Sequence, residues 1–359
     1  MAKAGSATSG RGGKDAKPTE YRFSFGPWNI HAGADPFGPA VRKDQELREK
    51  IGLFRGLGFD YVQFHDDDAV PNDLDAAATA RAAKELQKVL RGEGLAAEFV
   101  APRLWEDPRT IDGGYTATDP KDRKYAIERS KRAIDIARHL GTRKIVLWLA
   151  REGTYIRESK DPIGAVGRIV EAIDAMLEYD PEIRILGEMK PNEPMDQAYL
   201  PTPGHFMGLL YKTRDPQRVG VLIESAHTIL AGLDPSDDMA YTLWHKKLWG
   251  VHLNDQSGLK FDEDKAFGSV DLRRAFNQVW VLERGGFGRN GEVVGLDVKA
   301  MRTTRQEDNV QHLVNSRRVF LALLDKVRSL DLARVEEWRK ARQYEQLDLY
   351  IVEHLLGIA

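Results

Sequence analysis

VGVLIE at residues 219–224 is an apolar run of strand length that ends on a glutamate. Three further apolar runs resemble it: IRILGE at 183–188, LWGVHL at 248–253 and EVVGLD at 292–297. Strands of a parallel sheet are buried on both faces and read as near-continuous apolar runs. The polar side chains at or beside the ends of the four runs are Glu188, Glu224, His252 and Asp297.

Earlier in the chain four more runs complete a set of eight, which is the number that closes a parallel barrel. They are FSFGPW (23–28), DYVQF (60–64), AAEFV (96–100) and KIVLWLA (144–150). Amphipathic stretches of helical period separate the runs, such as residues 74–94 with their glycine-rich end. The sequence therefore predicts an α/β fold, an eight-stranded parallel (β/α)8 TIM barrel with a C-terminal helical extension.

We divide the chain into three parts. Residues 1–20 form a disordered N-terminal lead, residues 21–330 the catalytic barrel, and residues 331–359 a helical arm for oligomerisation. In the arm, apolar residues recur at helical spacing, and we expect them to dock on another subunit. They are Trp338, Tyr344, Leu347, Tyr350, Ile351, His354 and Leu355.

Chemistry in such barrels lies at the C-terminal ends of the strands, where the carboxylates and histidine collect. His227 lies three residues past Glu224, and Asp262 and Asp264 follow His252 in the loop KFDEDKAFG. The chain has no cysteine, so any metal must be held by oxygen and nitrogen ligands. The pattern predicts a site for two divalent cations per subunit, with Glu224 as the bridging ligand.

The composition excludes several classes of partner. A net charge of -2 gives no reason to expect nucleic acid or an anionic membrane. No run reaches 18 apolar residues, and the N-terminus lacks the apolar core of a signal peptide. We expect a cytoplasmic enzyme with a small-molecule substrate.

Several motifs of the chain resemble the xylose isomerase family from about Tyr21 onward, among them FSFGPW (23–28) with ADPFG (34–38), LWLAREG (147–153) and the five that follow. These five are FHDDD (64–68), GEMKPNEP (187–194), AHTILAGL (226–233), QSGLKFDEDKAFG (256–268) and QLDLYIVEHLLG (346–357). The resemblance implies an aldose–ketose isomerase that uses two divalent cations, Mg²⁺, Mn²⁺ or Co²⁺. It implies a metal-assisted hydride shift after ring opening, with D-xylose to D-xylulose or D-glucose to D-fructose as the reaction. It also implies a C-terminal extension that wraps a neighbouring subunit, usually in a homotetramer.

Carried over residue by residue, the resemblance implies two metal sites. Glu188, Glu224 and Asp297 would hold the first cation. The second would be held by Glu224, His227, Asp262 and Asp264.

The resemblance also implies a set of groups that contact the sugar. Lys190 would contact the oxygen at carbon 1, and His65, oriented by Asp68, would assist ring opening. The aromatic residues assigned to the pocket are Trp28, Trp105, Trp148 and Phe37, the last one reaching into a neighbouring subunit's site.

One position departs from the family pattern. His252, within GVHLNDQSG, stands where the family has an aspartate ligand of the first metal. Rhamnose isomerases and ketose 3-epimerases use a histidine on this strand, so either His252 or Asp255 can supply the fourth ligand. If His252 coordinates, Asp255 becomes a supporting group or a substrate contact.

Other interpretations of the same residues remain open. His65 can cap the helix that follows it, Lys190 can pair with Glu193, and the tryptophans can be core residues. The alternative activity is a metal-dependent isomerase or epimerase of another sugar, such as L-rhamnose or a ketose 3-epimerase. A nuclease-like barrel is disfavoured, because the metal-bearing loops are acidic and would repel phosphates.

Overall fold

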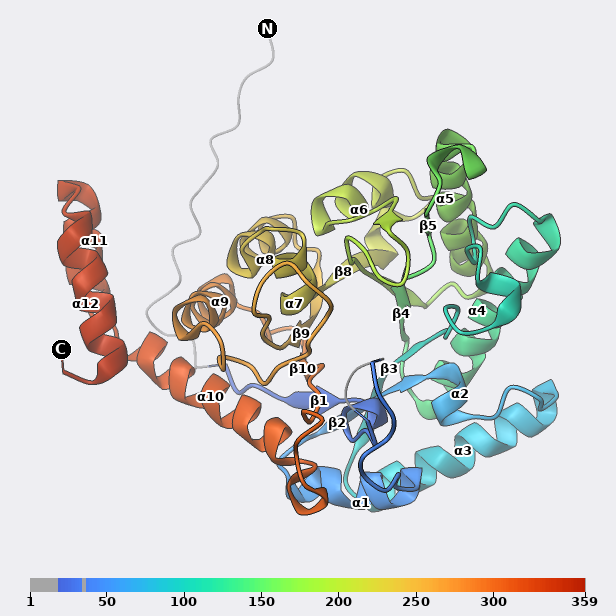
Figure 1. Ribbon diagram of the computed structural model, residues 1–359, viewed down its shortest axis with the longest axis horizontal. Helices are drawn as coiled ribbons and strands as arrows, with labels where there is room; N and C mark the ends of the chain where they lie inside the picture. The colour runs from blue at the N-terminus through green and yellow to red at the C-terminus, as the bar shows by residue number, and fades with distance from the viewer. Residues whose placement is uncertain (1–18, 34–36, 359) are drawn as a thin grey trace, which may run out of the picture.

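The computed structural model describes residues 19–33 and 37–358. In this part of the chain eight parallel strands form one closed barrel in the order β1-β10-β9-β8-β6-β4-β3-β2. Helices surround the barrel in the order of the chain, as Figure 1 shows. The predicted (β/α)8 barrel is therefore confirmed. Most of the predicted N-terminal lead lies outside the described residues.

All eight predicted runs are strands of the barrel. They are β1 (Phe23–Phe25), β2 (Tyr61–His65), β3 (Ala96–Ala101), β4 (Lys144–Trp148), β6 (Arg184–Glu188), β8 (Val219–Glu224), β9 (Leu248–Leu253) and β10 (Val294–Leu296). The first strand ends three residues earlier than predicted, because Pro27 begins a 3-10 turn, η1 (Pro27–Asn29). A two-stranded antiparallel sheet of β5 (Gly153–Thr154) and β7 (Gln197–Ala198) lies outside the barrel.

The helices of the barrel begin at recognisable signals. Aspartate caps the N-terminus of five of them, namely α3, α4, α5, α8 and α9, and each cap stabilises its helix by about 1 kcal/mol. The helices are α1 (Leu47–Gly56), α2 (Asp66–Ala69), α3 (Ala76–Gly92), α4 (Pro120–Leu140), α5 (Pro162–Tyr179), α6 (Pro203–Leu210), α7 (Ser225–Leu230), α8 (Pro235–Trp244), α9 (Leu272–Gly285) and α10 (Gln311–Arg328). Further 3-10 turns are η2 (Pro108–Thr110), η3 (Arg157–Ser159), η4 (Pro216–Arg218) and η5 (Gln306–Asp308).

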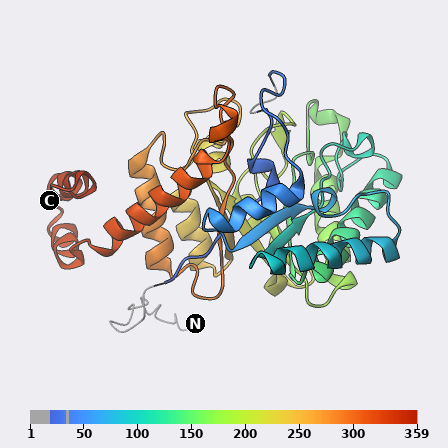
Figure 2. The ribbon, with the colours of Figure 1, turned by 90° about the horizontal axis from the view of Figure 1, so that it is seen from below.

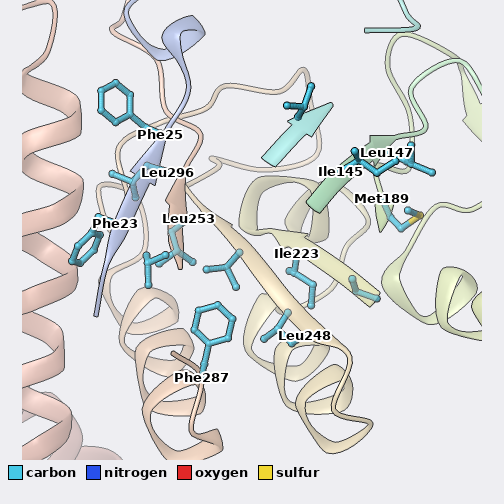
Figure 3. Packing of buried hydrophobic residues seen from close by; sticks show 14 of the residues in the cluster. Phe23, Phe25, Ile145, Leu147, Met189, Ile223, Leu248, Leu253, Phe287 and Leu296 are labelled. Atoms are coloured by element: carbon cyan, nitrogen blue, oxygen red, sulfur yellow. The ribbon is translucent and has the colours of Figure 1, made fainter. Parts of the chain in front are cut away.

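The main apolar core lies between the barrel and its helices. Phe23, Phe25 and Leu296 project from the neighbouring strands β1 and β10 into this layer, as Figure 3 shows. Their burial removes apolar surface from water, which contributes roughly 1.5–3 kcal/mol per large side chain. This layer fixes the strands and hence the positions of the side chains at their ends.

The barrel interior is apolar on one side only. A second cluster of buried side chains fills that side, namely Phe99, Ala101, Val146, Leu186, Leu222 and Trp249. On the other side lie the buried polar residues Ser24, Gln63 and Glu98. The sequence analysis did not single out this polar group.

The C-terminal segment forms two helices, α11 (Leu332–Ala341) and α12 (Tyr344–Leu356), that pack on each other, and α12 also packs on α10. They stand apart from the ring of barrel helices in both views (Figures 1 and 2). Tyr350 and Ile351 are buried, and Trp338 packs against Tyr350 with ring centroids 5.3 Å apart. Much of the apolar set expected to dock on another subunit therefore packs within the chain. Among the described helices, none is both long and apolar enough to cross a bilayer.

Candidate metal centre and substrate pocket

The predicted metal ligands meet at the C-terminal end of the barrel. Glu188 ends β6, Glu224 ends β8, and Asp297 directly follows β10. His252 lies on β9 opposite Glu224 in the strand register, so the two side chains enter the barrel mouth at the same level. Loop residues Asp262 and Asp264 reach the same place from the segment after β9.

His252 is the centre of the first group. Its Nδ1 lies 3.3 Å from Glu188 Oε1, 3.6 Å from Glu224 Oε2 and 3.9 Å from Asp297 Oδ2. Glu224, His252 and Asp297 each offer a ligand atom within 4.8 Å of the others. A cation among these atoms would be bound by one nitrogen and several oxygens.

His227 and the acidic loop make the second group. The Nε2 atom of His227 lies 3.2 Å from Glu224 Oε1 and 3.2 Å from Asp262 Oδ2. Glu224, Asp262 and Asp264 offer ligand atoms within 4.8 Å, as do Glu188, Glu224 and His227. Glu224 is a member of each of these three sets of neighbouring ligand atoms, as expected of a bridging ligand.

The electrostatics of the cluster fit a bound divalent cation. Burial, together with the charges of Asp297 and Asp262, raises the pKa of Glu224 well above its ordinary value. Burial and the charge of Asp262 also raise the pKa of Asp264, to about 7. Buried carboxylates that resist ionisation in this way gain a partner when a cation enters.

Two buried atoms of the cluster, Nδ1 of His227 and Oδ1 of Asp262, have no hydrogen-bond partner among the described residues. Buried polar atoms normally have a partner, so both are candidate metal-ligand atoms. The oxygen and nitrogen donors suit Mn²⁺, Co²⁺ or Zn²⁺, and Mg²⁺ less well where imidazole coordinates.

The charges around Glu188 and His252 favour an ion pair. Burial opposes ionisation of Glu188, but His252 and His227 outweigh it and lower its pKa to about 2. Burial likewise opposes protonation of His252, whereas the charges of Glu188, Asp297 and Glu98 raise its pKa to about 9. A cation would replace the proton on His252.

Three supporting residues were not identified from the sequence. Asn254 Nδ2 lies 2.9 Å from Glu224 Oε1 and 3.2 Å from Asp264 Oδ1, and it donates to both. Asn29 Nδ2 donates to Asp297 at 3.2 Å, and Lys299 forms an ion pair with Asp264. Their only signal in the sequence is that each follows a strand within a few residues of a predicted site residue.

The candidate metal centre opens into a pocket of about 650 Å³, which is a suitable size for a small ligand. Aromatic rings form one continuous wall of it. Trp28 lies 4.3 Å from His65, His65 lies 5.0 Å from Trp105, and Trp105 lies 4.6 Å from Trp148, measured between ring centroids. Trp28 also donates from Nε1 to Asp297 at 3.0 Å, so the wall contacts the metal centre directly.

His65 is both a helix cap and a pocket residue. It occupies the N-cap position of α2, and its ring lines the pocket. Its Nδ1 lies 2.7 Å from Asp68 Oδ2 and 2.8 Å from Nη2 of Arg103, a residue that the sequence analysis did not identify. Arg103 also donates to Asp68 at 2.6 Å. These contacts fix the orientation of the imidazole.

Lys190 lies in the pocket with its ammonium 2.9 Å from Asp262 Oδ2 and 3.1 Å from Glu193 Oε2. Burial opposes its charge, but Asp262 and Glu193 outweigh burial and raise its pKa. Its Nζ also lies 5.6 Å from the ring centroid of Trp148. Lys190 therefore forms the ion pair with Glu193 that the sequence left open, and it also contacts Asp262, one of the candidate metal ligands.

Two predicted substrate contacts have different surroundings. Phe37 is 71% exposed and lines the mouth of this chain's own pocket, where it packs against Phe261 at 5.1 Å between centroids. Asp255 does not line the pocket. Its carboxylate accepts hydrogen bonds from the backbone N–H groups of Val270 and Asp271, at 2.8 and 3.1 Å. Asp255 thus holds the loop that carries Asp262 and Asp264, and His252 rather than Asp255 faces the metal cluster.

The chain belongs to the xylose isomerase-like TIM barrel family, because the family model matches residues 52–280. Solved structures with the same fold share little sequence with it. One described as L-ribulose 3-epimerase has a TM-score of 0.62 and 14% identity over 90% of this chain and 98% of its own. A D-tagatose 3-epimerase-like protein has a TM-score of 0.61 and 14% identity, over 85% and 98%.

A third structure, an IOLI protein with a bound zinc atom, has a TM-score of 0.60 and 15% identity. The alignment covers 86% of this chain and all of the other. At such low identity these likenesses concern the fold.

Proposed function

We propose that the protein is a metal-dependent sugar isomerase that interconverts an aldose and a ketose, with D-xylose to D-xylulose as the leading candidate reaction. The single observation that carries the proposal is the position of Glu224 in all three groups of ligand atoms beneath one aromatic-walled pocket. A shared carboxylate with separate partners on each side suits a pair of cations. The first would be bound by Glu188, Glu224, His252 and Asp297, and the second by Glu224, His227, Asp262 and Asp264.

Divalent cations in this cluster would polarise a carbonyl oxygen and the neighbouring hydroxyl oxygen of an open-chain sugar. The chain's own groups serve the rest of the reaction. The wall of Trp28 and Trp148 excludes water from the reacting carbons. The ammonium of Lys190 stabilises negative charge on the carbon 1 oxygen. His65, oriented by Asp68, transfers a proton at the ring oxygen when the cyclic sugar opens.

A second candidate function is a ketose 3-epimerase. It is favoured by the histidine at position 252 and by two structures with the same fold, an L-ribulose 3-epimerase and a D-tagatose 3-epimerase-like protein. An epimerase moves a proton at carbon 3 and therefore needs two bases that flank that carbon. Among the described acids that line the pocket, Glu106 and Glu193 are the two that lie outside the proposed ligand set. Glu193 is engaged with Lys190, so an epimerase would have to use carboxylates of the proposed ligand set as its bases. The solved structures with the same fold support this second candidate more directly than they support the xylose reaction.

One experiment separates the two functions. The purified protein is incubated in D₂O with aldopentoses, aldohexoses and the matching ketoses, with Mn²⁺, Co²⁺ or Mg²⁺, and the products are identified by NMR. An isomerase should yield aldose–ketose pairs, whereas an epimerase should yield ketose pairs that carry deuterium at carbon 3. We expect Mn²⁺ and Co²⁺ to support more activity than Mg²⁺, because His252 supplies a nitrogen ligand. Absence of both reactions with all three metals would contradict the proposal.

A further inference from the structure

Directly below the metal centre, three polar side chains are buried inside the barrel. Ser24 on β1, Gln63 on β2 and Glu98 on β3 come from adjacent strands and are between 0 and 4% exposed. Glu98 Oε2 accepts from Ser24 Oγ at 2.5 Å and from Gln63 Nε2 at 3.0 Å. Burying a carboxylate costs free energy unless its oxygens are hydrogen-bonded, and apolar residues could fill the same space without that cost. A buried carboxylate at this position therefore points to a specific role.

A bulge in β3 allows two successive residues, Glu98 and Phe99, to face into the barrel. Val62 pairs with Ala97, but Phe64 pairs with Val100, so β3 has one extra residue between these pairs. Glu98 and Phe99 therefore both lie opposite Gln63, whose neighbours Val62 and Phe64 pack in the outer core. Bulges re-aim side chains in this way and occur next to active sites.

Gly295 allows this polar group to approach His252. In the register of the barrel, Gly295 on β10 lies between Ser24 on β1 and His252 on β9. A Cβ atom at Gly295 would lie 2.5 Å from Gln63 Nε2 and 2.8 Å from His252 Cδ2. No side chain larger than hydrogen fits there, and Gln63 and the imidazole face each other across the glycine.

The two facing side chains have complementary unsatisfied atoms. Nε2 of His252 and Oε1 of Gln63 are both buried and have no hydrogen-bond partner among the described residues. When Nδ1 of His252 faces the ligand cluster as an acceptor for a cation, the ring carries its proton on Nε2 and needs an acceptor there. Glu98, by accepting from Gln63 Nε2, determines which end of the Gln63 amide is nitrogen and leaves Oε1 as the acceptor.

We propose that Glu98 and Gln63 are positioning residues for His252. Gln63 Oε1 accepts a hydrogen bond from the Nε2–H of His252, directly or through one buried water, and Glu98 holds the Gln63 amide in the required orientation. The chain Glu98–Gln63–His252 thereby presents Nδ1 to the cation and excludes the other tautomer. This inference rests on the proposed function in one respect, because it takes His252 as a metal ligand.

The test compares Glu98→Gln and Gln63→Met with the wild-type protein. Mn²⁺ affinity is measured by titration with EPR detection, and the coordination of Co²⁺ by its visible absorption spectrum. Outer partners of metal-bound histidines typically change affinity by about 10–100-fold, so we expect both variants to lose roughly tenfold or more and to shift the Co²⁺ spectrum. Glu152→Gln is the matched control, because Glu152 is also a buried carboxylate but accepts from the backbone of Gly114, Tyr115 and Thr116 outside the pocket. The control should keep the wild-type affinity and spectrum even if its melting temperature falls.

A measurement on the wild-type protein covers the case in which the variants do not fold. In the Mg²⁺- or Zn²⁺-loaded protein labelled with ¹⁵N-histidine, the ring of His252 should show a slowly exchanging proton on Nε2, assigned by its loss in His252→Asn. A proton on Nδ1 would overturn the inference, as would wild-type Mn²⁺ affinity and Co²⁺ spectra in both variants. If the wild-type protein itself binds neither Mn²⁺ nor Co²⁺, the proposed function fails first.

Discussion

Glu224 shows how one residue can define a site. Its carboxylate is buried, accepts from Asn254, and lies 3.2 Å from His227 on one side and 3.6 Å from His252 on the other. Burial and neighbouring carboxylates hold its pKa well above its ordinary value, so the side chain resists ionisation until a cation offsets that repulsion. A neutral amide at this position would keep the shape and lose the charge.

The first prediction is therefore that Glu224→Gln weakens metal binding at both groups and abolishes turnover. Calorimetric titration with Mn²⁺ should show the loss of both binding events, and sugar assays should show no product. Glu106→Gln neutralises a pocket carboxylate outside the proposed ligand set and should retain the metal. Two tightly bound ions in Glu224→Gln would exclude the bridging role.

Lys190 provides the second prediction at this scale. If its ammonium stabilises charge on the reacting oxygen, Lys190→Met should lower kcat by on the order of a hundredfold, as when one oxyanion donor is lost. Metal binding should persist, because Lys190 is not a ligand. Glu193→Gln separates this role from simple ion pairing, because it removes the partner of Lys190 at 3.1 Å and leaves the ammonium in place. Equal losses of kcat in the two variants would favour the structural role.

The loop after β9 is held by hydrogen bonds between its two ends, Asp255 and Lys265. Asp255 and Lys265 exchange two backbone hydrogen bonds, at 2.9 and 3.1 Å, and the Asp255 carboxylate accepts from the N–H groups of Val270 and Asp271 just before α9. Asp264, within this loop, has a positive φ of 46°, which a residue other than glycine adopts only when its surroundings hold it. The position of Asp262 and Asp264 therefore depends on Asp255.

A third prediction follows for this loop. Asp255→Ala should lower metal affinity at the second group by roughly tenfold or more, while the affinity of the first group changes little. Mn²⁺ titrations measure both. Asp271→Ala is the control, because it removes the cap of α9, at a cost of about 1 kcal/mol, without releasing the loop. Equal metal binding in Asp255→Ala and the wild type would show that the loop holds its shape without this carboxylate.

The arrangement of the strands explains which residues of the site could be predicted from the sequence. Glu188, Glu224, His252 and Asp297 end near-continuous apolar runs, and the strands of a parallel barrel bring such ends together wherever the barrel closes. Gln63 and Glu98 could not be placed in the same way. Gln63 lies in the middle of its run, and whether it faces the axis or the helices depends on register. Glu98 and Phe99 both face inward because of a bulge, which no local pattern in AAEFV indicates.

At the scale of the whole molecule, the buried charges of the site link stability to pH. The pKa of Asp264 is raised from 3.8 to about 7 by burial and by Asp262, and that of His252 from 6.5 to about 9 by Glu188 against the effect of burial. A raised pKa in the folded state gives stability that is present below the unfolded pKa and is lost as pH rises through the folded pKa. Asp264 therefore lowers stability as pH rises from about 4 to 7, and His252 lowers it from 6.5 to about 9, so the two effects have the same sign and overlap only near pH 6.5–7.

The fourth prediction is that the melting temperature of the metal-free protein falls by roughly a few degrees from pH 6.5 to pH 9. Differential scanning calorimetry in EDTA measures it. Added Mn²⁺ should raise the melting temperature more at pH 8 than at pH 6.5, because the cation competes with protons for the same atoms. Asp264→Asn should reduce the slope only near pH 6.5–7, because His252 carries the change at higher pH. A metal-free protein that becomes more stable over this range would contradict the assignment.

The C-terminal hairpin of α11 and α12 lies outside the ring of barrel helices (Figures 1 and 2). It is attached to the barrel by few contacts, including Lys326 Nζ to the backbone oxygen of His354 at 2.6 Å and the ion pair of Arg273 with Asp348 at 2.9 Å. While Tyr350 and Ile351 face inward, an apolar stripe on the other side of α12 is exposed. Leu349, Val352 and Leu356 form this stripe at helical spacing, with exposures of 57%, 38% and 69%.

The last prediction is that this stripe contacts another subunit in solution. Exposed apolar stripes of this kind commonly mark interfaces, and charge on them opposes burial. Leu349→Glu combined with Leu356→Glu should lower the molar mass measured by light scattering, while the melting temperature stays near that of the wild type because the inward face is intact. Ile163→Glu is the matched control, since Ile163 is 86% exposed at the start of α5. Deletion of residues 331–359 alone would be ambiguous, because it also uncovers the barrel surface beneath Tyr350. An unchanged molar mass in the double variant would place any subunit contact elsewhere and leave the stripe a solvent-exposed surface.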